Sequence, residues 1–460
     1  MAILRERPGS GSDGGRITTS LRHVAFAAAV GSALEWYDFF IYGTAAALVF
    51  NELFFPKYDP AVGTLAAFAT FGVGFLARPF GGLFFGHLGD RMGRQPVLVI
   101  TLLLVGIGTF LIGLLPTYAE IGIWAPTLLV LLRLVQGFGA GAEYGGAVIL
   151  AVEYAPEGKR GLFGSWAPVG VTAGNLMAAG VFALVSSMPK ESFLSWGWRI
   201  PFLISLVIVA VGIYIRLRVA ETPVFSDVAQ RRPPLKAPVW QAVRRHPRNF
   251  LVVIGARMAE NGLGYLFPVF GLSYVINTVH VPKSTALLAV VAGNIVELGT
   301  IVFFSWLSDR VGRRPVYMGG ALFSALFAFP FFLMVDTGNT VLIWLAFIII
   351  MGVGGGAMFG PQAAYFAELF GPRLRYSGFA FAREIGSILA GGPAPFLSGL
   401  LVVWMGGQPW GVALYVIALS LITAAAVWWG PETHVSDLSA DADDRSIDLS
   451  APQTAVGHTG

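Results

Sequence analysis

The chain of 460 residues is 55% hydrophobic and only 12% charged, about half the charged fraction of a typical soluble domain, so its composition indicates a polytopic membrane protein. It contains no cysteine, which excludes disulfides, thiolate nucleophiles and thiolate metal sites. The formal net charge of +4 comes from unevenly placed Lys and Arg and does not indicate nucleic-acid binding.

Twelve apolar runs of bilayer-spanning length follow a polar, Gly- and Ser-rich segment at 1–21. That segment lacks the apolar core of a cleaved signal peptide, so we expect the first run to stay as a membrane anchor. The runs lie at 23–49, 61–87, 97–115, 122–151, 162–186, 199–217, 250–278, 284–307, 316–335, 340–366, 377–403 and 410–430. They predict an all-α polytopic membrane protein, with tails at 1–21 and 431–460 and a linker at 218–249 between six-helix bundles at 22–217 and 250–430.

Lys and Arg concentrate on one side of the predicted membrane. An even number of crossings places both tails and the basic linker on the same side. The opposite side keeps only Lys57, Lys190, Arg199 and Lys283. The positive-inside bias therefore predicts cytoplasmic termini in a plasma or inner membrane. This topology, together with contact with anionic membrane lipid, accounts for the basic linker.

Two turns between apolar runs share the motif D-R-x-G-R-x-P. G-H-L-G-D-R-M-G-R-Q-P stands at 86–96 and S-W-L-S-D-R-V-G-R-R-P at 305–315, so Asp90 and Asp309 are 219 positions apart. Turns of this polarity belong at a membrane surface, because hydrocarbon cannot satisfy their backbone. Glycines recur at 137, 141 and 145 and again at 352, 356 and 360, a spacing that favours close helix packing. These repeats indicate a duplicated bundle.

Several of these motifs resemble the major facilitator superfamily: the D-R-x-G-R-[RQ]-P turn in both halves, R-x-x-Q-G at 133–137, and an E-x6-R spacing at 153–160 and 368–375. Within it, E-W-Y-D-F-F-I-Y-G at 35–43 resembles the metabolite:proton symporters, whose members carry shikimate, 2-oxoglutarate, citrate, and proline or betaine. The resemblance implies proton-coupled uptake of a small carboxylate or zwitterion by alternating access. We expect a monomer that needs no cofactor beyond the proton gradient. The short acidic tail has no heptads, so we do not expect the coiled coil of osmosensing members.

Ionisable side chains at membrane depth are costly and need a reason. No histidine lies at a helix centre, so a proton relay must use carboxylates. Glu35, Asp38 and Tyr42 share one stripe of the first helix, and Arg133 lies at a matching depth on the fourth. We therefore predict proton coupling by Asp38 and Arg133, in which the arginine keeps the carboxylate ionised until the contact is released. A permanent ion pair is the alternative, and Glu35 is either a relay partner or a hydrogen-bonded acid.

The resemblance places the substrate between helices one, four, seven and ten, and we extend the candidates to helix eight. They are Tyr42, Gln136, Arg257, Glu260, Asn261, Tyr265, Asn294 and Glu297. Arg257 suits a carboxylate because its fork binds two oxygens, although Glu260 could neutralise it instead. We expect Arg383 and Glu384 to have structural roles.

The paired turns supply a second group of charged candidates. They are Asp90, Arg91, Arg94, Glu153, Arg160, Asp309, Arg310, Arg313, Glu368 and Arg375. We predict that they form a cytoplasmic charge cluster that latches one conformational state. The alternative is that the turns are simply solvated.

Three other functions compete with proton-coupled uptake, and the first of them stays open as an alternative. A proton-driven exporter would use the same intramembrane carboxylates. A membrane enzyme is disfavoured because the chain has no G-x4-G-K-[ST], HExxH or cysteine site and no soluble domain for a cofactor. The duplicated halves favour alternating access over a channel.

Overall fold

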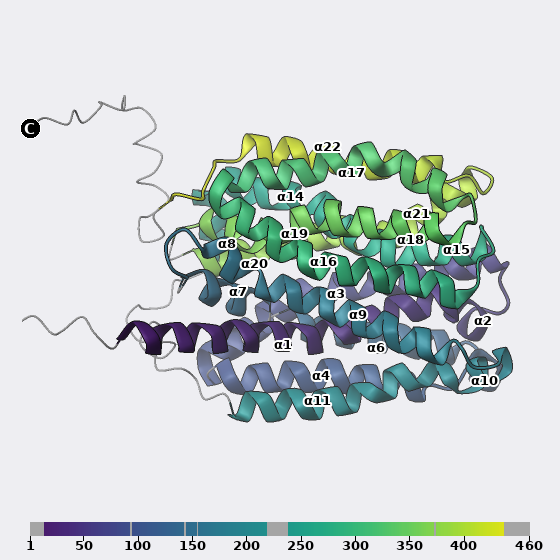
Figure 1. The fold of residues 1–460 in the computed structure, drawn as a ribbon. Helices are drawn as coiled ribbons and strands as arrows, with labels where there is room; N and C mark the ends of the chain where they lie inside the picture. Colours follow the sequence, from purple (N-terminus) through teal and green to yellow (C-terminus); the bar gives the residue numbers. More distant parts are fainter. Residues whose placement is uncertain are drawn as a thin grey trace, which may run out of the picture.

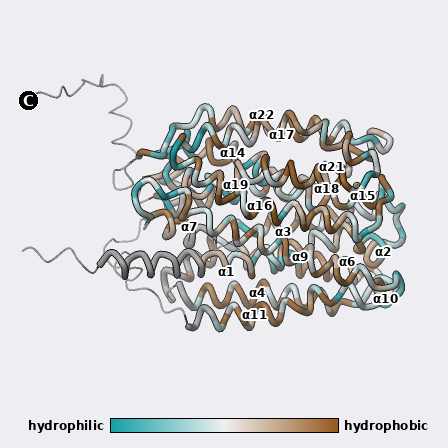
Figure 2. The backbone as a smooth tube through the Cα atoms, viewed as in Figure 1, coloured by the Kyte–Doolittle hydropathy of each residue, from teal (hydrophilic) through white to brown (hydrophobic). Residues whose placement is uncertain are grey.

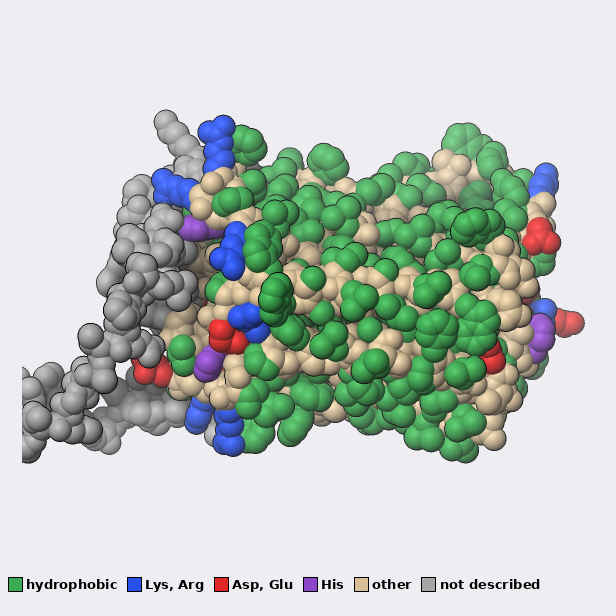
Figure 3. All heavy atoms as spheres, turned by 90° about the horizontal axis from the view of Figure 1, so that it is seen from above, with side chains coloured by type: hydrophobic (Ala, Val, Ile, Leu, Met, Phe, Trp, Pro, Cys, Tyr) green, Lys and Arg blue, Asp and Glu red, His purple; other side chains and the backbone are tan. Residues whose placement is uncertain are grey.

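The computed structural model describes residues 13–92, 94–141, 144–153, 155–218, 238–371 and 374–436. Two bundles of long helices lie side by side, with the N-terminal half below the C-terminal half in Figure 1. Hydrophobic residues predominate along the middle of the helices (Figure 2). On the face drawn in Figure 3, hydrophobic side chains cover the middle and charged side chains gather towards the two ends. We call the end where the first helix begins and the last one ends the terminal end, and the other the opposite end.

The N-terminal half contains six crossings. They are α1 (Asp13–Leu48), α3 (Pro60–Met92), α4 (Arg94–Leu114), α6 with α7 (Trp124–Ala140, Tyr144–Glu153), α8 with α9 (Arg160–Gly164, Trp166–Val185) and α11 (Ile200–Arg218). Short helices join them at the opposite end: α2 (Phe50–Phe54), α5 (Tyr118–Ile121), α10 (Lys190–Ser195) and η1 (Gly197–Arg199).

The C-terminal half also contains six, preceded by α13 (Pro238–Arg245). They are α14–η2–α15 (Pro247–Tyr265, Leu266–Gly271, Leu272–Asn277), α16 (Lys283–Val311), α17 (Arg313–Val335), α18–η3–α19 (Thr340–Ile349, Ile350–Gly355, Gly356–Glu368), α20–η4–α21 (Arg375–Gly386, Ser387–Gly391, Ala394–Trp404) and α22 (Trp410–Trp429). The segments η2, η3 and η4 are π-helical, a distortion often found at functional sites.

Nine crossings in the described ranges are long and apolar enough by composition alone to span a membrane. Of the other three, α6 is apolar but shorter than this limit, and α1 and α14 carry charged residues predicted from the sequence: Glu35, Asp38, Arg257 and Glu260. A bilayer requires such helices to bury their polar groups against one another. The four charged residues of α1 and α14 are accordingly buried.

Small residues allow the helices of each bundle to approach closely. A Cβ on Gly137 would lie 1.9 Å from the Gly74 carbonyl oxygen, and one on Gly141 would lie 1.9 Å from that of Arg78. Any larger residue at these positions of α6 would push it away from α3. Packing is the role that the four-residue glycine spacing predicts.

The two halves touch at both ends, so the structure is occluded. At the terminal end Gly161 of α8 packs against Ser305 of α16. At the opposite end Gly399 of α21 packs against Leu65 of α3, and the Lys283 ammonium donates a hydrogen bond across the halves to the Leu48 carbonyl at 3.1 Å. A central pocket lies between these closures.

Candidate substrate pocket and charged clusters

The pocket lies between the halves and has a volume of about 60 Å³. This exceeds the roughly 10–15 Å³ that one water requires, but it is well below the roughly 300–1,000 Å³ of typical ligand sites. Helices α1 and α9 line it from the N-terminal half, and α14, η2, α16, η3, α19 and α20 line it from the other. The small volume is consistent with a substrate site contracted in an occluded state.

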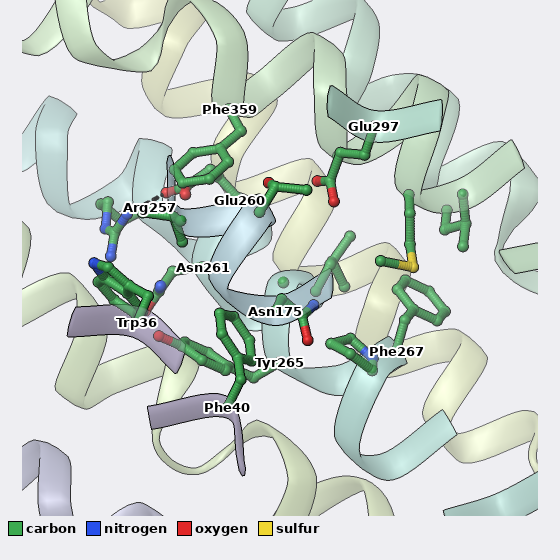
Figure 4. A pocket seen from close by; sticks show the side chains of 18 of the residues that line it. Trp36, Phe40, Asn175, Arg257, Glu260, Asn261, Tyr265, Phe267, Glu297 and Phe359 are labelled. Atoms are coloured by element: carbon green, nitrogen blue, oxygen red, sulfur yellow. Dashed lines mark hydrogen bonds and ion pairs between the residues drawn. The ribbon is translucent and has the colours of Figure 1, made fainter. Parts of the chain in front are cut away.

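Arg257 lines one side of the pocket (Figure 4). Its guanidinium donates to Glu260 at 2.6 Å and to the Ser387 hydroxyl in η4 at 2.8 Å, while its Nε has no hydrogen-bond partner in the described part of the chain. The neutralising contact with Glu260, considered from the sequence, is thus formed in this state. One donor of Arg257 remains available.

Aromatic rings form much of the pocket wall. Tyr265 stacks against Trp36 at 6.4 Å between ring centroids and lies 5.5 Å from Phe40. The Tyr265 hydroxyl and the Asn261 side-chain carbonyl are buried and without a hydrogen-bond partner among the described residues. Buried polar groups are almost always paired in folded proteins, so these two are well placed to meet a ligand.

An ion-pair network that the sequence reasoning missed joins the two halves beside the pocket. Arg78 of α3 contacts Glu384 of α20 at 2.8 Å, and Arg383 contacts the same carboxylate at 2.8 Å. Arg383 also lines the pocket, and both guanidiniums lie over the Trp36 ring, at 5.1 and 5.8 Å from its centroid. Arg78 has no acid within one turn of its own helix. That signal could have pointed to a partner on another helix.

Asp38 does not form the predicted ion pair with Arg133. It is 1% exposed and accepts a hydrogen bond from the Ser205 hydroxyl at 2.5 Å. Trp36 and Phe40 occupy the pocket-facing side of α1, so Asp38, between them in sequence, faces α4 and α11 within the N-terminal bundle. The predicted pair is wrong because of the rotation of α1 about its axis. The prediction compared the depths of Asp38 and Arg133 in the membrane but did not establish the direction in which the Asp38 side chain points.

Arg133 is connected to the surroundings of Asp38 through other polar groups. It donates to Gln136 at 3.2 Å, and Gln136 donates to the Thr109 hydroxyl at 2.6 Å. Thr109 lies beside the Asp38 carboxylate. Arg133 also lies 4.3 Å from the centroid of the Tyr42 ring. Two hydrogen bonds therefore lead from Arg133 to Thr109, which lies near Asp38, where a direct pair was predicted.

The substrate candidates divide between the pocket and its surroundings. Arg257, Glu260, Asn261, Tyr265 and Glu297 line the pocket. Three others do not. Tyr42 donates to the Thr70 hydroxyl at 2.7 Å within the N-terminal bundle, Gln136 takes part in the two hydrogen bonds just described, and Asn294 accepts from Asn175 at 3.0 Å between the halves. Glu35 is buried near Arg78.

At the terminal end, the structure brings six of the paired-turn residues together. Asp309 accepts hydrogen bonds from the backbone N–H groups of Gly161 and Leu162, at 2.8 and 2.9 Å, and contacts Arg313 at 2.7 Å. It thus caps the start of α8 in the other half, where an anion is favoured. Arg313 also pairs with Glu368 at 3.1 Å.

A second connection at this end crosses between the halves. Arg375 forms an ion pair with Glu153, and Arg160 donates to the Ser436 carbonyl at 2.6 Å. Arg310 is exposed and stacks on Trp306, so it stands outside the cluster. The side chains of Asp90, Arg91 and Arg94 lie outside the described residues.

Glu432 supports the cluster from the end of α22, and the sequence reasoning did not assign it a role. Burial favours its protonation, but the backbone N–H groups of Arg313, Arg314, Thr433 and His434 donate to it and lower its pKa below the ordinary value. The carboxylate therefore stays ionised and caps the start of α17. Thr433 adds a hydrogen bond to Glu368 at 2.7 Å.

Comparison with known proteins identifies the family. The Sugar (and other) transporter model matches residues 24–237, and the Major Facilitator Superfamily model matches residues 250–451. A shikimate transporter of Escherichia coli (strain K12) is 42% identical over 429 residues, covering 92% of this chain and 96% of the relative. The chain belongs to the major facilitator superfamily.

Two further comparisons describe this major facilitator protein. The inner membrane metabolite transport protein YhjE of the same organism is 38% identical, covering 91% of this chain and 96% of the relative. The proton:xylose symporter XylE has a similar fold, with a TM-score of 0.71 at 18% identity over 92% of this chain and 98% of that one. Twelve crossings in two six-helix bundles are thus confirmed. The protein is a multi-pass transporter of the cytoplasmic membrane, and not an enzyme.

Proposed function

We propose that this transporter is a proton-coupled symporter that takes up a small carboxylate or zwitterionic metabolite by alternating access. The observation that carries the proposal is a closed central pocket that joins Arg257 and Arg383 to unpaired hydrogen-bonding groups. A guanidinium fork binds both oxygens of a carboxylate. The similarity to a shikimate transporter supports a carboxylate as well, because shikimate is one.

Buried carboxylates support the coupling to protons. Asp38 and Glu35 are enclosed in the N-terminal bundle, and an ionised carboxylate there requires a compensating partner. Changes in the connection between Asp38 and Arg133 would change the proton affinity of Asp38. Uptake of a labelled organic acid into cells tests the proposal. Uptake should fall to the passive level when a protonophore is added, whereas unaffected accumulation would contradict proton coupling.

The proposed topology places both termini and the linker at 218–249 in the cytoplasm. The opposite end, with Lys57, Lys190 and Lys283, would then face outward, as the positive-inside bias requires. We expect reporter fusions that are active only in the periplasm to be active at residues 57, 190 and 283 and inactive at 235. The reverse pattern would contradict this orientation.

Alternating access requires each closure to open in turn. Asp309→Asn keeps the shape of the side chain but removes the charge that caps α8, and charged hydrogen bonds contribute about 1.5–3 kcal/mol. We expect the terminal end to open about tenfold more often and uptake to slow. The native chain has no cysteine, so a thiol reagent can report opening at Ala363→Cys, which lies beside Gly164 at this closure.

Asp336→Asn is the matched control for this experiment. Asp336 accepts a hydrogen bond from Tyr274 at 2.8 Å within the C-terminal half at the opposite end, so its variant should leave labelling of Ala363→Cys unchanged. Equal labelling rates in the wild type and Asp309→Asn would show that the cluster is not a latch.

A further inference from the structure

One carboxylate in the pocket has no partner among the residues that the structure describes. Glu297 of α16 points into the pocket from the side opposite Arg257 (Figure 4). Its carboxylate makes no hydrogen bond or ion pair with the described residues, whereas Glu260 and Glu384 are both ion-paired. Gly355 leaves space for it, since a Cβ there would lie 2.8 Å from Glu297 Oε1. An unpaired carboxylate in such a place needs a counterpart.

The two sides of the pocket differ in chemistry. On one side, the guanidiniums of Arg257 and Arg383 suit a carboxylate. On the other, Glu297 and the Asn175 amide provide oxygen acceptors. Aromatic rings surround the space between them, including Trp36, Phe267 and Phe359. Aromatic faces attract cations, and ammonium groups are commonly held by such rings.

We infer that the substrate is a zwitterion, oriented with its carboxylate towards Arg257 and Arg383 and its cationic nitrogen towards Glu297. The inference rests on the proposed function and narrows its substrate class. A monoanion would satisfy the arginine side but would leave Glu297 without a partner. A zwitterion satisfies both sides without adding net charge to a buried site, where net charge is costly. Glu297 is therefore the residue that selects for the cationic nitrogen.

Equilibrium binding to the purified full-length protein tests this orientation, with glycine betaine and proline as zwitterionic probes and shikimate as the anionic probe. We expect both zwitterions to bind the wild type at least tenfold tighter than shikimate. Glu297→Gln should weaken their binding at least tenfold and leave shikimate unchanged or bound more tightly. Glu297→Asp, which keeps the charge but withdraws it by one methylene, should lie between. Glu191→Gln, in the exposed α10, is the matched control.

The outcomes separate this inference from the proposed function. Tighter binding of shikimate than of both zwitterions, with no effect of Glu297→Gln, would overturn the inference while leaving carboxylate transport intact. Equal loss of all three probes in Glu297→Gln and Glu297→Asp would also overturn it, because a general disturbance of the pocket does not depend on ligand charge. Failure of the wild type to bind any of the three would contradict the proposed function itself.

Discussion

Arg257→Ala is expected to weaken substrate binding about a hundredfold, since charged hydrogen bonds of about 1.5–3 kcal/mol would be lost at the carboxylate. Part of the loss of binding in Arg257→Ala would come from the effect on Glu260 and not from the lost contact with substrate. Glu260 would lose the contact at 2.6 Å, and an unpaired buried charge is strongly destabilising. The measurement is equilibrium binding of whichever probe among shikimate, proline and glycine betaine the wild type holds most tightly.

The double variant Arg257→Ala, Glu260→Ala separates the two effects. It removes both charges, so it should regain thermal stability relative to Arg257→Ala but should not regain binding. If the double variant binds its probe as the wild type does, Arg257 serves only to neutralise Glu260. Arg257→Lys should bind weakly, because a point charge cannot reproduce a two-oxygen fork.

Asp38→Asn is expected to abolish accumulation driven by a pH gradient while preserving substrate exchange without one. The Ser205 hydroxyl donates a hydrogen bond to the Asp38 carboxylate at 2.5 Å in the native chain. The amide keeps an oxygen that can accept this bond, so the bundle should fold. The amide cannot take up or release a proton at physiological pH. Glu35→Gln is the matched neighbour and should have the milder effect if Glu35 is not itself the relay.

The hydrogen bonds of Arg133 lead to a prediction for two further variants. Arg133→Ala should impair coupling strongly, and Gln136→Leu should reproduce part of the effect because Gln136 joins Arg133 to Thr109. In proteoliposomes, accumulation measures coupling to the proton gradient, and counterflow measures substrate exchange without a gradient. If Asp38→Asn still concentrates substrate in response to protons, the coupling carboxylate is elsewhere. Normal coupling in Gln136→Leu would exclude this hydrogen-bonded route.

Much of the fold could be predicted because the bilayer restricts the possibilities. Apolar runs of sufficient length must be helices, and the repeated turns around Asp90 and Asp309 revealed the duplication. What could not be predicted was the rotation of each helix about its axis. Around Asp38, α1 is buried on every side, so the stripe of Glu35, Asp38 and Tyr42 does not show which neighbouring helix it faces. For this reason the sequence indicated the depth of Asp38 along its helix but not its hydrogen-bond partner.

The lining of the pocket was predictable where one helix carries it. Arg257, Glu260, Asn261 and Tyr265 follow one another along α14, and all line the pocket. The contacts of Arg78 and Glu384 depend on which helices are neighbours across the two halves, 306 positions apart in sequence. The π-helical segments, including η4, which begins at Ser387, were not predicted from the sequence either.

The most direct test of proton-coupled transport is uptake of a labelled probe into proteoliposomes of the wild-type protein, with the outside made acidic relative to the inside. Shikimate, proline and glycine betaine are each used, and their final internal levels are compared with and without the gradient. Symport predicts that the transported probe rises above its external concentration under the gradient and falls back when a protonophore is added. A final level that equals the external concentration with or without the gradient, despite rapid exchange, would contradict proton coupling.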